Sequence, residues 1–460
     1  MWTLEKESIV ARTEVLLLTN RDSDNIGDQI IEASVISLLK AAAENLGIAS
    51  QSFIVRSRAA SIISKKYMST GDESLLESAR RAISRADVVV FGGAPLFNYV
   101  YQVFYRRTIR TVELAEEYGV PVLFSSIGVE PYNDADERSL ALQSALRKSV
   151  VRQITTRDDL ESTQKYVEGT GIPTALVSDP AVFADSVFEK VRPIDDPRGR
   201  SRKRIGLVVT RSGVFPDNGI PFSEADQRNF WLGVIDELTA RGDDYRLFTT
   251  GHFDDEIFLD SLVRHHGVQG KKAAVTLNSP EELIEQLRSC DGVIAYRLHA
   301  SITSFAFDIP SIGLTWNFKV PDFYRSVDYP ERALESADWK PSTVLSALDR
   351  AMSEGVEKDD DFMISVYRTL FSGLKGILKP SEQIEPYSLE ELREKLPRYA
   401  GTSRKQYQEK MRRKLRRSYG FYQDKIAANA VEPSVGQSGR TQPQSLLRSV
   451  RTRLKRGLKR

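Results

Sequence analysis

Short runs rich in Val, Ile and Leu alternate with longer amphipathic stretches along most of this chain. The first run, EVLLLT at 14–19, precedes IGDQIIEASVISLLKAAAENLG, whose apolar spacing predicts a helix that ends at Gly47. Similar runs recur in the first half at 87–93, 120–128, 151–158 and 174–183. Continuous apolar strands separated by helices are typical of parallel sheets that helices cover on both faces.

The alternation breaks at 195–204, DDPRGRSRKR, which is rich in charge, Pro and Gly. It then resumes with apolar runs at 205–211, 245–251, 272–277, 292–297 and 310–315. We therefore predict an α/β protein with two Rossmann-like, doubly wound domains, residues 1–194 and 205–396, joined by the linker 195–204 and facing a cleft. In such sheets ligands bind at the carboxyl ends of the strands.

The composition sets limits on the kind of protein. Apolar residues make up 41% of the chain, which fits a globular core. Cys290 is the only cysteine, which excludes an internal disulfide framework and a zinc ribbon and suits a reducing compartment. No run of about 18 uncharged apolar residues exists to span a membrane, and the acidic residues in MWTLEKESIV argue against a cleaved secretion signal. We expect a cytoplasmic protein.

The charge is divided unevenly between body and tail. Residues 397–460 contain 18 Lys or Arg and 3 Asp or Glu, whereas the other 396 residues contain 47 basic and 60 acidic ones. Apolar residues recur at helical spacing within this basic tail, at Tyr407, Met411, Leu415, Tyr419 and Tyr422 and again at Leu447, Val450, Leu454 and Leu458. The segment 428–445 between them is rich in Ser, Gly, Pro and Gln, and we expect it to be disordered.

Basic amphipathic segments favour anionic membrane surfaces. We therefore expect residues 401–460 to attach the protein peripherally, at the inner face of the plasma membrane. RNA binding and a solvated tail without a partner are the alternatives, and we expect no nucleic acid as a partner.

The stretch TNRDSDNIGDQII, residues 19–31, leaves the first predicted strand and enters a helix. Asp24 or Asn25 can cap that helix, and Gly27 lets the backbone approach a ligand, so the helix N-terminus is a candidate anion site. A plain strand–helix turn is the alternative. Neither GxGxxG nor GxxxxGK[ST] occurs, so dinucleotide and P-loop sites lack support.

Other predicted strand ends carry polar residues or glycine. Gly92-Gly93 can let backbone amides face a phosphate or carboxylate, and close strand–helix packing is the alternative. Glu130 stands at another strand end, and Arg157 at a third, where its guanidinium can fork onto a carboxylate or phosphate. His252 follows a strand of the second half and is a further candidate for ligand binding.

The segment AYRLHASITSFAFDIPSIGLTWNFK, residues 295–319, places basic groups of three types at its turns. Arg297 and His299 begin a predicted helix, whose N-terminus favours negative charge. The helix ends before Pro310, a further strand follows, and Lys319 comes after it. We expect Arg297, His299 and Lys319 to converge on the cleft and to bind a small polyanionic substrate. A buried core residue is the alternative for His299 taken alone.

Taken in order, these motifs resemble those of the polysaccharide pyruvyl transferase family over roughly residues 15–330. The matching residues are Asn25-x-Gly27-Asp28, Gly92-Gly93, Ser126-x-Gly128, Arg157-Asp158 with Ser162, Asp179-Pro180, and Arg297-Leu298-His299-Ala300 leading to Pro310 and Lys319. The chain departs from the family pattern at Ala94 and at Val129-Glu130, where further glycines are common. The basic tail lies outside the resemblance.

The resemblance implies a GT-B-like fold and a transferase that moves a pyruvyl group from phosphoenolpyruvate onto a sugar. The acceptor would be a cell-surface glycan or its lipid-linked precursor, and the product a ketal with release of phosphate. Phosphoenolpyruvate is a donor substrate, so no cofactor is expected. No step requires a metal, and four His without matching Cys or Glu spacing do not make a metal site.

This chemistry needs cations for the carboxylate and phosphate, an acid for the methylene carbon and a base for the sugar hydroxyl. We assign proton transfer first to His299, because its ordinary pKa lies near 6.5. Asp28 and Glu130 are candidates for orienting or deprotonating the hydroxyl. The predicted substrate-binding residues are Arg157, Arg297, Lys319, Asn25, Gly27, Gly92, Gly93 and His252.

Two other functions fit the same predicted architecture. One is a GT-B-type glycosyltransferase that uses a nucleotide sugar, and donor dependence separates it from a pyruvyl transferase. The other is a non-catalytic glycan-binding or scaffold protein, which would bind glycans or vesicles without releasing phosphate. The joint presence of Arg297, His299 and Lys319 argues against a scaffold, which has no need of them.

Overall fold

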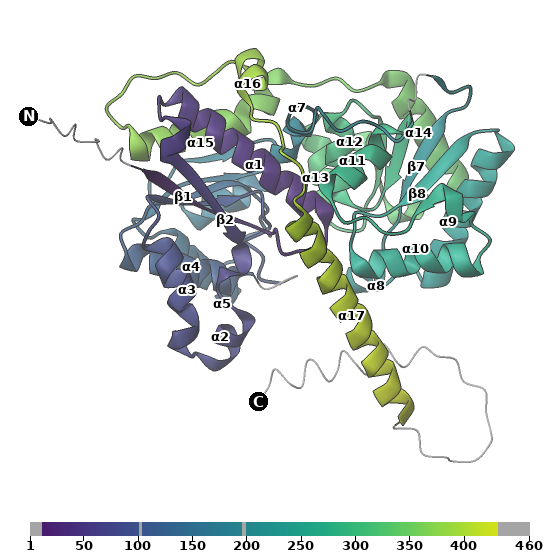
Figure 1. Cartoon of the computed structure of the whole chain (residues 1–460), viewed down its shortest axis with the longest axis horizontal. Helices are drawn as coiled ribbons and strands as arrows, with labels where there is room; N and C mark the ends of the chain where they lie inside the picture. Colours follow the sequence, from purple (N-terminus) through teal and green to yellow (C-terminus); the bar gives the residue numbers. More distant parts are fainter. Residues whose placement is uncertain (1–11, 101–103, 196–198, 431–460) are drawn as a thin grey trace, which may run out of the picture.

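The computed structural model describes residues 12–100, 104–195 and 199–430 of the 460-residue chain. Two six-stranded sheets, each wholly parallel and flanked by helices, form its two domains (Figure 1). The predicted α/β fold with two doubly wound, Rossmann-like domains is confirmed.

The first sheet has the strand order β2-β1-β3-β4-β5-β6. Its strands are β1 (Thr13–Thr19), β2 (Phe53–Ala59), β3 (Val88–Gly92), β4 (Val122–Ile127), β5 (Val151–Thr156) and β6 (Thr174–Leu176). The central strands β3 and β4 are buried along their whole length, as their continuous apolar runs predict. The edge strand β2 has no such run, and the sequence analysis did not find it.

Seven helices of the described residues belong to the first half of the chain. They are α1 (Ile26–Asn45), α2 (Lys65–Thr70), α3 (Glu77–Ile83), α4 (Tyr105–Glu117), α5 (Glu137–Leu146), α6 (Leu160–Tyr166) and α7 (Ala184–Val187). Helix α1 follows the prediction: Asn25 caps its start, and Gly47 follows its end with a positive φ of 70°.

The second sheet has the order β12-β11-β10-β7-β8-β9. Its strands are β7 (Arg204–Val208), β8 (Asp244–Phe248), β9 (Ala273–Ala274), β10 (Gly292–Ala295), β11 (Ser311–Leu314) and β12 (Ala333–Leu334). The accompanying helices are α8 (Val214–Asp217), α9 (Glu224–Ala240), α10 (Phe253–His265), α11 (Pro280–Arg288), α12 (Leu298–Ala306), α13 (Lys319–Ser326) and α14 (Pro341–Glu354).

After α14 the chain returns to the first domain. Helix α15 (Asp360–Leu378) packs on the first sheet, where Ser178 Oγ donates to the Met363 carbonyl at 2.8 Å and Gln153 Nε2 to the Thr369 carbonyl at 3.0 Å. The domain boundaries remain a prediction, but this helix lies within the range 205–396 and contacts the other domain. Helix α16 (Leu389–Lys395) follows it.

Helix α1 lies between the two domains, as Figure 1 shows. At its start the Ile26 amide donates to the Thr250 carbonyl of the second domain at 2.7 Å. A Cβ on Gly251 would lie 2.6 Å from Ile26 Cδ1, so glycine is needed for this close approach. One continuous apolar core extends from α1 into α11 and α12, and it fixes the α1 N-terminus against the second domain.

Helix α17 (Arg404–Ala430) confirms that part of the basic tail is helical, and it joins both domains (Figure 1). Lys414 is buried and donates to Glu256 of α10 at 2.6 Å, while Arg417 forms an ion pair with Asp24 of the first domain. The segment predicted to be disordered, 428–445, begins within α17, so the prediction is wrong for residues 428–430. The rest of that segment and the second apolar pattern, 446–460, lie outside the described residues. Within the described part of the chain, no helix is long and apolar enough to cross a membrane.

Candidate active site

Four chain segments bring polar side chains together where the domains meet. The first turn of α1 supplies Asp28, the residue after β5 is Arg157, the first turn of α12 holds His299, and α13 begins at Lys319. Arg157 and Lys319 both act electrostatically on Asp28 and on His299. The predicted strand ends therefore lie close together. Asp28 and Arg157 come from the first domain, and His299 and Lys319 come from the second.

The cap of α1 fixes the histidine. Asn25 Oδ1 accepts a hydrogen bond from the Gly27 amide at 3.2 Å, so its Nδ2 faces His299 Nδ1 at 3.0 Å. Because Nδ2 can only donate, Nδ1 of a neutral His299 accepts and its proton lies on Nε2. One capping residue thus starts the helix and selects the imidazole tautomer.

Burial and positive neighbours keep His299 neutral. Burial is the largest effect that lowers the pKa of His299 well below its ordinary value, and the charges of Arg157, Lys319 and Arg297 lower it further. The pKa of Lys319 is also lowered, by burial and by Arg157. The charges of Asp158, Glu130 and Asp28 oppose this shift but do not cancel it, so an anionic ligand beside Lys319 would be favoured.

Among the carboxyl groups of the cluster, that of Asp28 has a strongly raised pKa. Its side chain is buried, and burial raises its pKa to about 6 despite the opposing charges of Arg157 and Lys319. Ser23 and Asn20 hydrogen-bond this carboxyl, and Asn20 Nδ2 lies 3.0 Å from Asp28 Oδ2. A carboxyl group with a pKa near 6 holds a proton in about one-tenth of the molecules at pH 7 and can give it up.

Replacing Asn25 by Asp is expected to raise the pKa of His299. The carboxylate still caps α1, but it accepts from Nδ1 and favours the imidazolium. The pH titration of the His299 imidazole, followed by NMR, should move to higher pH. An unchanged titration in a folded Asn25→Asp protein would contradict the assigned contact, and Asn25→Ser, which keeps the cap without the charge, is the matched control.

Arg297 belongs to a neighbouring group, and its charge acts on His299 as those of Arg157 and Lys319 do. Its guanidinium forks onto Asp255, with Nε and Nη2 at 2.7 and 2.6 Å from the two carboxylate oxygens. Burial alone would raise the pKa of Asp255, but the pairing with Arg297 holds this pKa below its usual range. His252 occupies the N-cap position of α10 without a side-chain capping hydrogen bond, and its Nδ1 lies 3.9 Å from Asp255 Oδ1. Arg297 therefore anchors the start of α12 and acts on His299 through its charge.

Glu130 and the two glycines have mainly structural contacts. One carboxylate oxygen of Glu130 accepts from the Tyr99 and Val100 amides, both at 2.8 Å, and the charge of Glu130 acts on Lys319. The Gly93 amide donates to the Ser125 carbonyl at 2.9 Å, so it does not face a ligand. A Cβ on Gly92 or Gly93 would collide with α1, which makes the packing alternative the better interpretation of this pair.

Several contacts around the cluster were not predicted. Asp179 forms a buried ion pair with Arg157, and Asp158 accepts from the Val129 amide at 2.9 Å. The sequence analysis gave no role to Asp255 or to Asn20. The sequence marks these residues only by their position, because each follows a strand or begins a helix on the same side of its sheet.

Nothing in this cluster resembles a metal centre. In the ranges that the structure describes, no three His, Cys, Asp or Glu side chains are grouped so that they could hold an ion. Arg157 and Lys319 instead provide donors for carboxylate or phosphate oxygens.

The fold and this cluster define a two-domain α/β protein of the GT-B-like kind with a cationic site at the domain junction. The family model for polysaccharide pyruvyl transferase matches residues 25–317, which include every residue of the cluster except Lys319. The chain belongs to this family, as its motifs indicated.

Solved structures agree with the fold. A Listeria monocytogenes structure, provisionally assigned as a UDP-N-acetylglucosamine 2-epimerase, has a TM-score of 0.52 and 10% identity and covers 82% of this chain and 100% of its own. The S. aureus MnaA structure with UDP has a TM-score of 0.50, 11% identity and the same coverage. At this identity the likeness concerns the fold alone. No curated protein sequence matches the chain.

Proposed function

We propose that this protein transfers a pyruvyl group from phosphoenolpyruvate to two hydroxyls of a sugar in a glycan or its precursor. The observation that carries the proposal is the convergence of Arg157, His299 and Lys319 beside the buried carboxyl of Asp28. Phosphoenolpyruvate presents a carboxylate and a phosphate on one small carbon frame, which suits two cations and a neutral donor. Family membership supports the same activity.

The cations would hold the donor, and His299 would orient it. Arg157 can fork onto an oxyanion, Lys319 provides a point charge, and His299 donates from Nε2. Arg157 and Lys319 line a cavity of ≈10 Å³, which is room for about one water molecule. The domains must therefore separate for the donor to enter, as hinged two-domain enzymes do.

We assign the first proton donation to Asp28 rather than to His299, because a neutral imidazole is a poor acid. The proton passes from Asp28 to the methylene carbon, and a sugar hydroxyl forms a bond to the neighbouring carbon and gives its proton to the carboxylate that Asp28 has become. The bond from that carbon to the phosphate oxygen then breaks, and phosphate leaves with the electron pair. A second hydroxyl adds to the same carbon, passes its proton to the departing phosphate and closes the ketal.

Donor binding tests the proposal against the two alternatives. Titration calorimetry should detect binding of phosphoenolpyruvate that is weakened at least about tenfold by Lys319→Gln, because a charge-assisted hydrogen bond is removed. Binding of a sugar nucleotide without binding of phosphoenolpyruvate would instead favour a glycosyltransferase. Glycan binding with neither donor would favour a scaffold.

We also propose that α17 attaches the protein peripherally to an anionic membrane on the cytoplasmic side. The apolar residues that the sequence placed on one helix face include Leu415, which is 70% exposed, and Tyr419, which is 63% exposed. The basic side chains Lys410 and Lys414 point into the protein, while Arg412 is exposed beside the apolar residues. Apolar groups flanked by arginine suit the headgroup region of an anionic bilayer.

The double variant Leu415→Ser/Tyr419→Ser is expected to bind anionic vesicles at least about tenfold more weakly, because burial of one large apolar side chain contributes about 1.5–3 kcal/mol. Cosedimentation with vesicles that contain anionic lipid measures the effect. Ser418→Ala on the same exposed helix is the matched control and should bind as the parent does. Equal binding of parent and double variant would refute the membrane contact.

A further inference from the structure

A large cavity lies at the mouth of the cleft, between α2, α4, α17 and the loop that follows β1. Its volume is ≈950 Å³, far larger than the space between Arg157 and Lys319. Three separate helices contribute basic side chains to its wall: Lys65 from α2, Arg106 and Arg107 from α4, and Arg413, Arg416 and Arg417 from α17. Asp22 and Asp24 are the acidic residues in this lining.

Most of these cations have no carboxylate partner. Arg417 pairs with Asp24, whereas within the described ranges Lys65, Arg106, Arg107, Arg413 and Arg416 form no ion pair. The Nε of Arg413 is buried and makes no hydrogen bond to any described residue. Lys65, Arg106 and Arg416 are exposed to solvent, and Asp22 acts electrostatically on Arg107. Even so, six basic side chains face two carboxylates in this lining, and such an excess of positive charge in one cavity indicates an anionic ligand.

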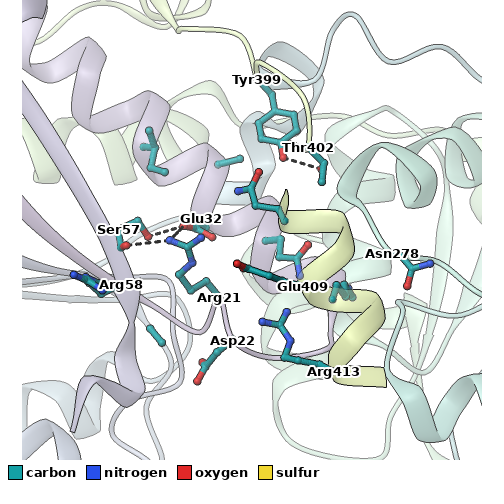
Figure 2. Close-up of a pocket in the computed structure, with 16 residues that line it drawn as sticks. Arg21, Asp22, Glu32, Ser57, Arg58, Asn278, Tyr399, Thr402, Glu409 and Arg413 are labelled. Atoms are coloured by element: carbon teal, nitrogen blue, oxygen red, sulfur yellow. Dashed lines mark hydrogen bonds and ion pairs between the residues drawn. The ribbon is translucent and has the colours of Figure 1, made fainter. Parts of the chain in front are cut away.

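An adjoining cavity of ≈420 Å³ shares Asp22 and Arg413 with the first, and Figure 2 shows Arg413 of α17 directed into the space beside Asp22. Lys410, one turn earlier on α17, also lines this space, and its ammonium group is buried and makes no hydrogen bond to any described residue. Burial lowers the pKa of Lys410 to about 7, so the lasting positive charge on this side is that of Arg413. Two consecutive turns of α17 therefore direct basic side chains into adjoining cavities.

The large cavity leads to the reacting groups. Asn20 and Ser23 belong to its lining, and both hydrogen-bond the carboxyl of Asp28. His252 of the second domain lines it from the other side. A ligand with an anionic group against α4 and α17 can therefore extend a sugar toward Asp28 when the domains part.

We propose that this cavity binds the diphosphate group of a glycosyl diphosphate, which is the acceptor of the transfer. That the ligand is the acceptor rests on the proposed function, whereas the anion site itself rests on the geometry alone. Six basic side chains against two carboxylates exceed what one phosphate needs, and the volume holds more than one phosphate. A diphosphate offers several acceptor oxygens that arginine can bind in pairs. Helix α17, which lies beyond the family match at 25–317, thus completes the acceptor site.

The test compares the full-length parent with Arg413→Gln/Arg416→Gln, using inorganic pyrophosphate as the probe in titration calorimetry. Binding should weaken at least about tenfold, because each lost charge-assisted contact is worth that much or more. Arg404→Gln/Lys405→Gln, on the exposed first turn of α17, is the matched control and should leave binding unchanged. Arg107→Gln on α4 changes the opposite wall and should weaken binding even if the α17 variant proves unstable.

Turnover then distinguishes the source of the diphosphate. A uridine-diphosphate sugar and a polyprenyl-diphosphate sugar are compared with a simple glycoside, and the double variant should raise KM for one of the diphosphates while leaving KM for phosphoenolpyruvate unchanged. The inference would be overturned if pyrophosphate bound equally well to the parent and to the variants of all three arginines. It would also be overturned if KM were equal for phosphorylated and simple acceptors in both parent and variant. Arginine-dependent pyrophosphate binding without any pyruvyl transfer would support the anion site and refute the proposed activity.

Discussion

Replacing Asp28 by Asn is expected to lower kcat/KM for pyruvyl transfer by about 10²–10⁴-fold, the usual contribution of a general acid. The amide keeps the size of the carboxyl group and can still accept from Asn20, but it has no proton to give to the methylene carbon. Steady-state phosphate release from phosphoenolpyruvate measures the loss. Glu32→Gln, which alters a carboxyl group on the same helix outside the cluster, is the matched control.

The pH dependence identifies the reason for the loss. With a pKa of about 6, Asp28 loses its proton as the pH rises through 6, so kcat/KM of the parent should fall as the pH rises above 6. The pH profile of Asp28→Asn should lack this alkaline decrease. A variant that keeps both the rate and the alkaline decrease would show that another group donates the proton.

The same shift predicts a gain in stability from Asp28→Asn. The folded-state pKa of about 6 lies above the ordinary 3.8, so the favourable contribution of the protonated form is complete below pH 3.8 and is lost as the pH rises through 6. At neutral pH the buried carboxylate then costs on the order of 3 kcal/mol, an upper bound set by the shift. Urea unfolding at pH 7.5 should show the variant to be more stable than the parent although it is inactive.

Gly27→Ala is expected to lower kcat/KM by about 10²-fold, the effect of misplacing a reacting group by about 1 Å. A Cβ at this position would lie 2.2 Å from His299 Cβ and 2.4 Å from Nδ1, so the imidazole must move away from Asn25. The mutation is otherwise mild, because φ at Gly27 is not positive.

The matched control is Gly376→Ala on α15, where an added Cβ meets nothing within 4 Å. That change should leave activity intact and stabilise the helix slightly, by about 0.5–1 kcal/mol. Thermal unfolding separates a displaced histidine from a damaged fold. Full activity in a folded Gly27→Ala protein would contradict the place of His299 in the site.

The strands and the site segments could be predicted because each has a local signal. The continuous apolar runs at 87–93 and 120–128 became the buried strands β3 and β4, and RLHA became the start of α12. Edge strand β2 was missed because its residues alternate between partly buried and exposed and form no apolar run. Its place was fixed only by pairing with β1.

Partners distant in sequence could not be predicted. Arg297 pairs with Asp255, 42 residues earlier, and no local pattern reveals such a contact. Substrate binding by Arg297 stays a prediction. For α17 the sequence showed an apolar side but not that Lys414 would be buried against Glu256, 158 residues away. Both cases depend on how the elements pack in three dimensions rather than on the spacing within one element.

The most direct test of the account is product analysis after incubating the full-length protein with phosphoenolpyruvate and a panel of simple and diphosphate-linked glycosides. We expect phosphate release that requires an acceptor, and by mass spectrometry the gain of one pyruvyl ketal on that sugar, with Asp28→Asn inactive in parallel. If no sugar gains a pyruvyl group while a sugar nucleotide serves as a glycosyl donor, the pyruvyl transfer assigned to this site is wrong.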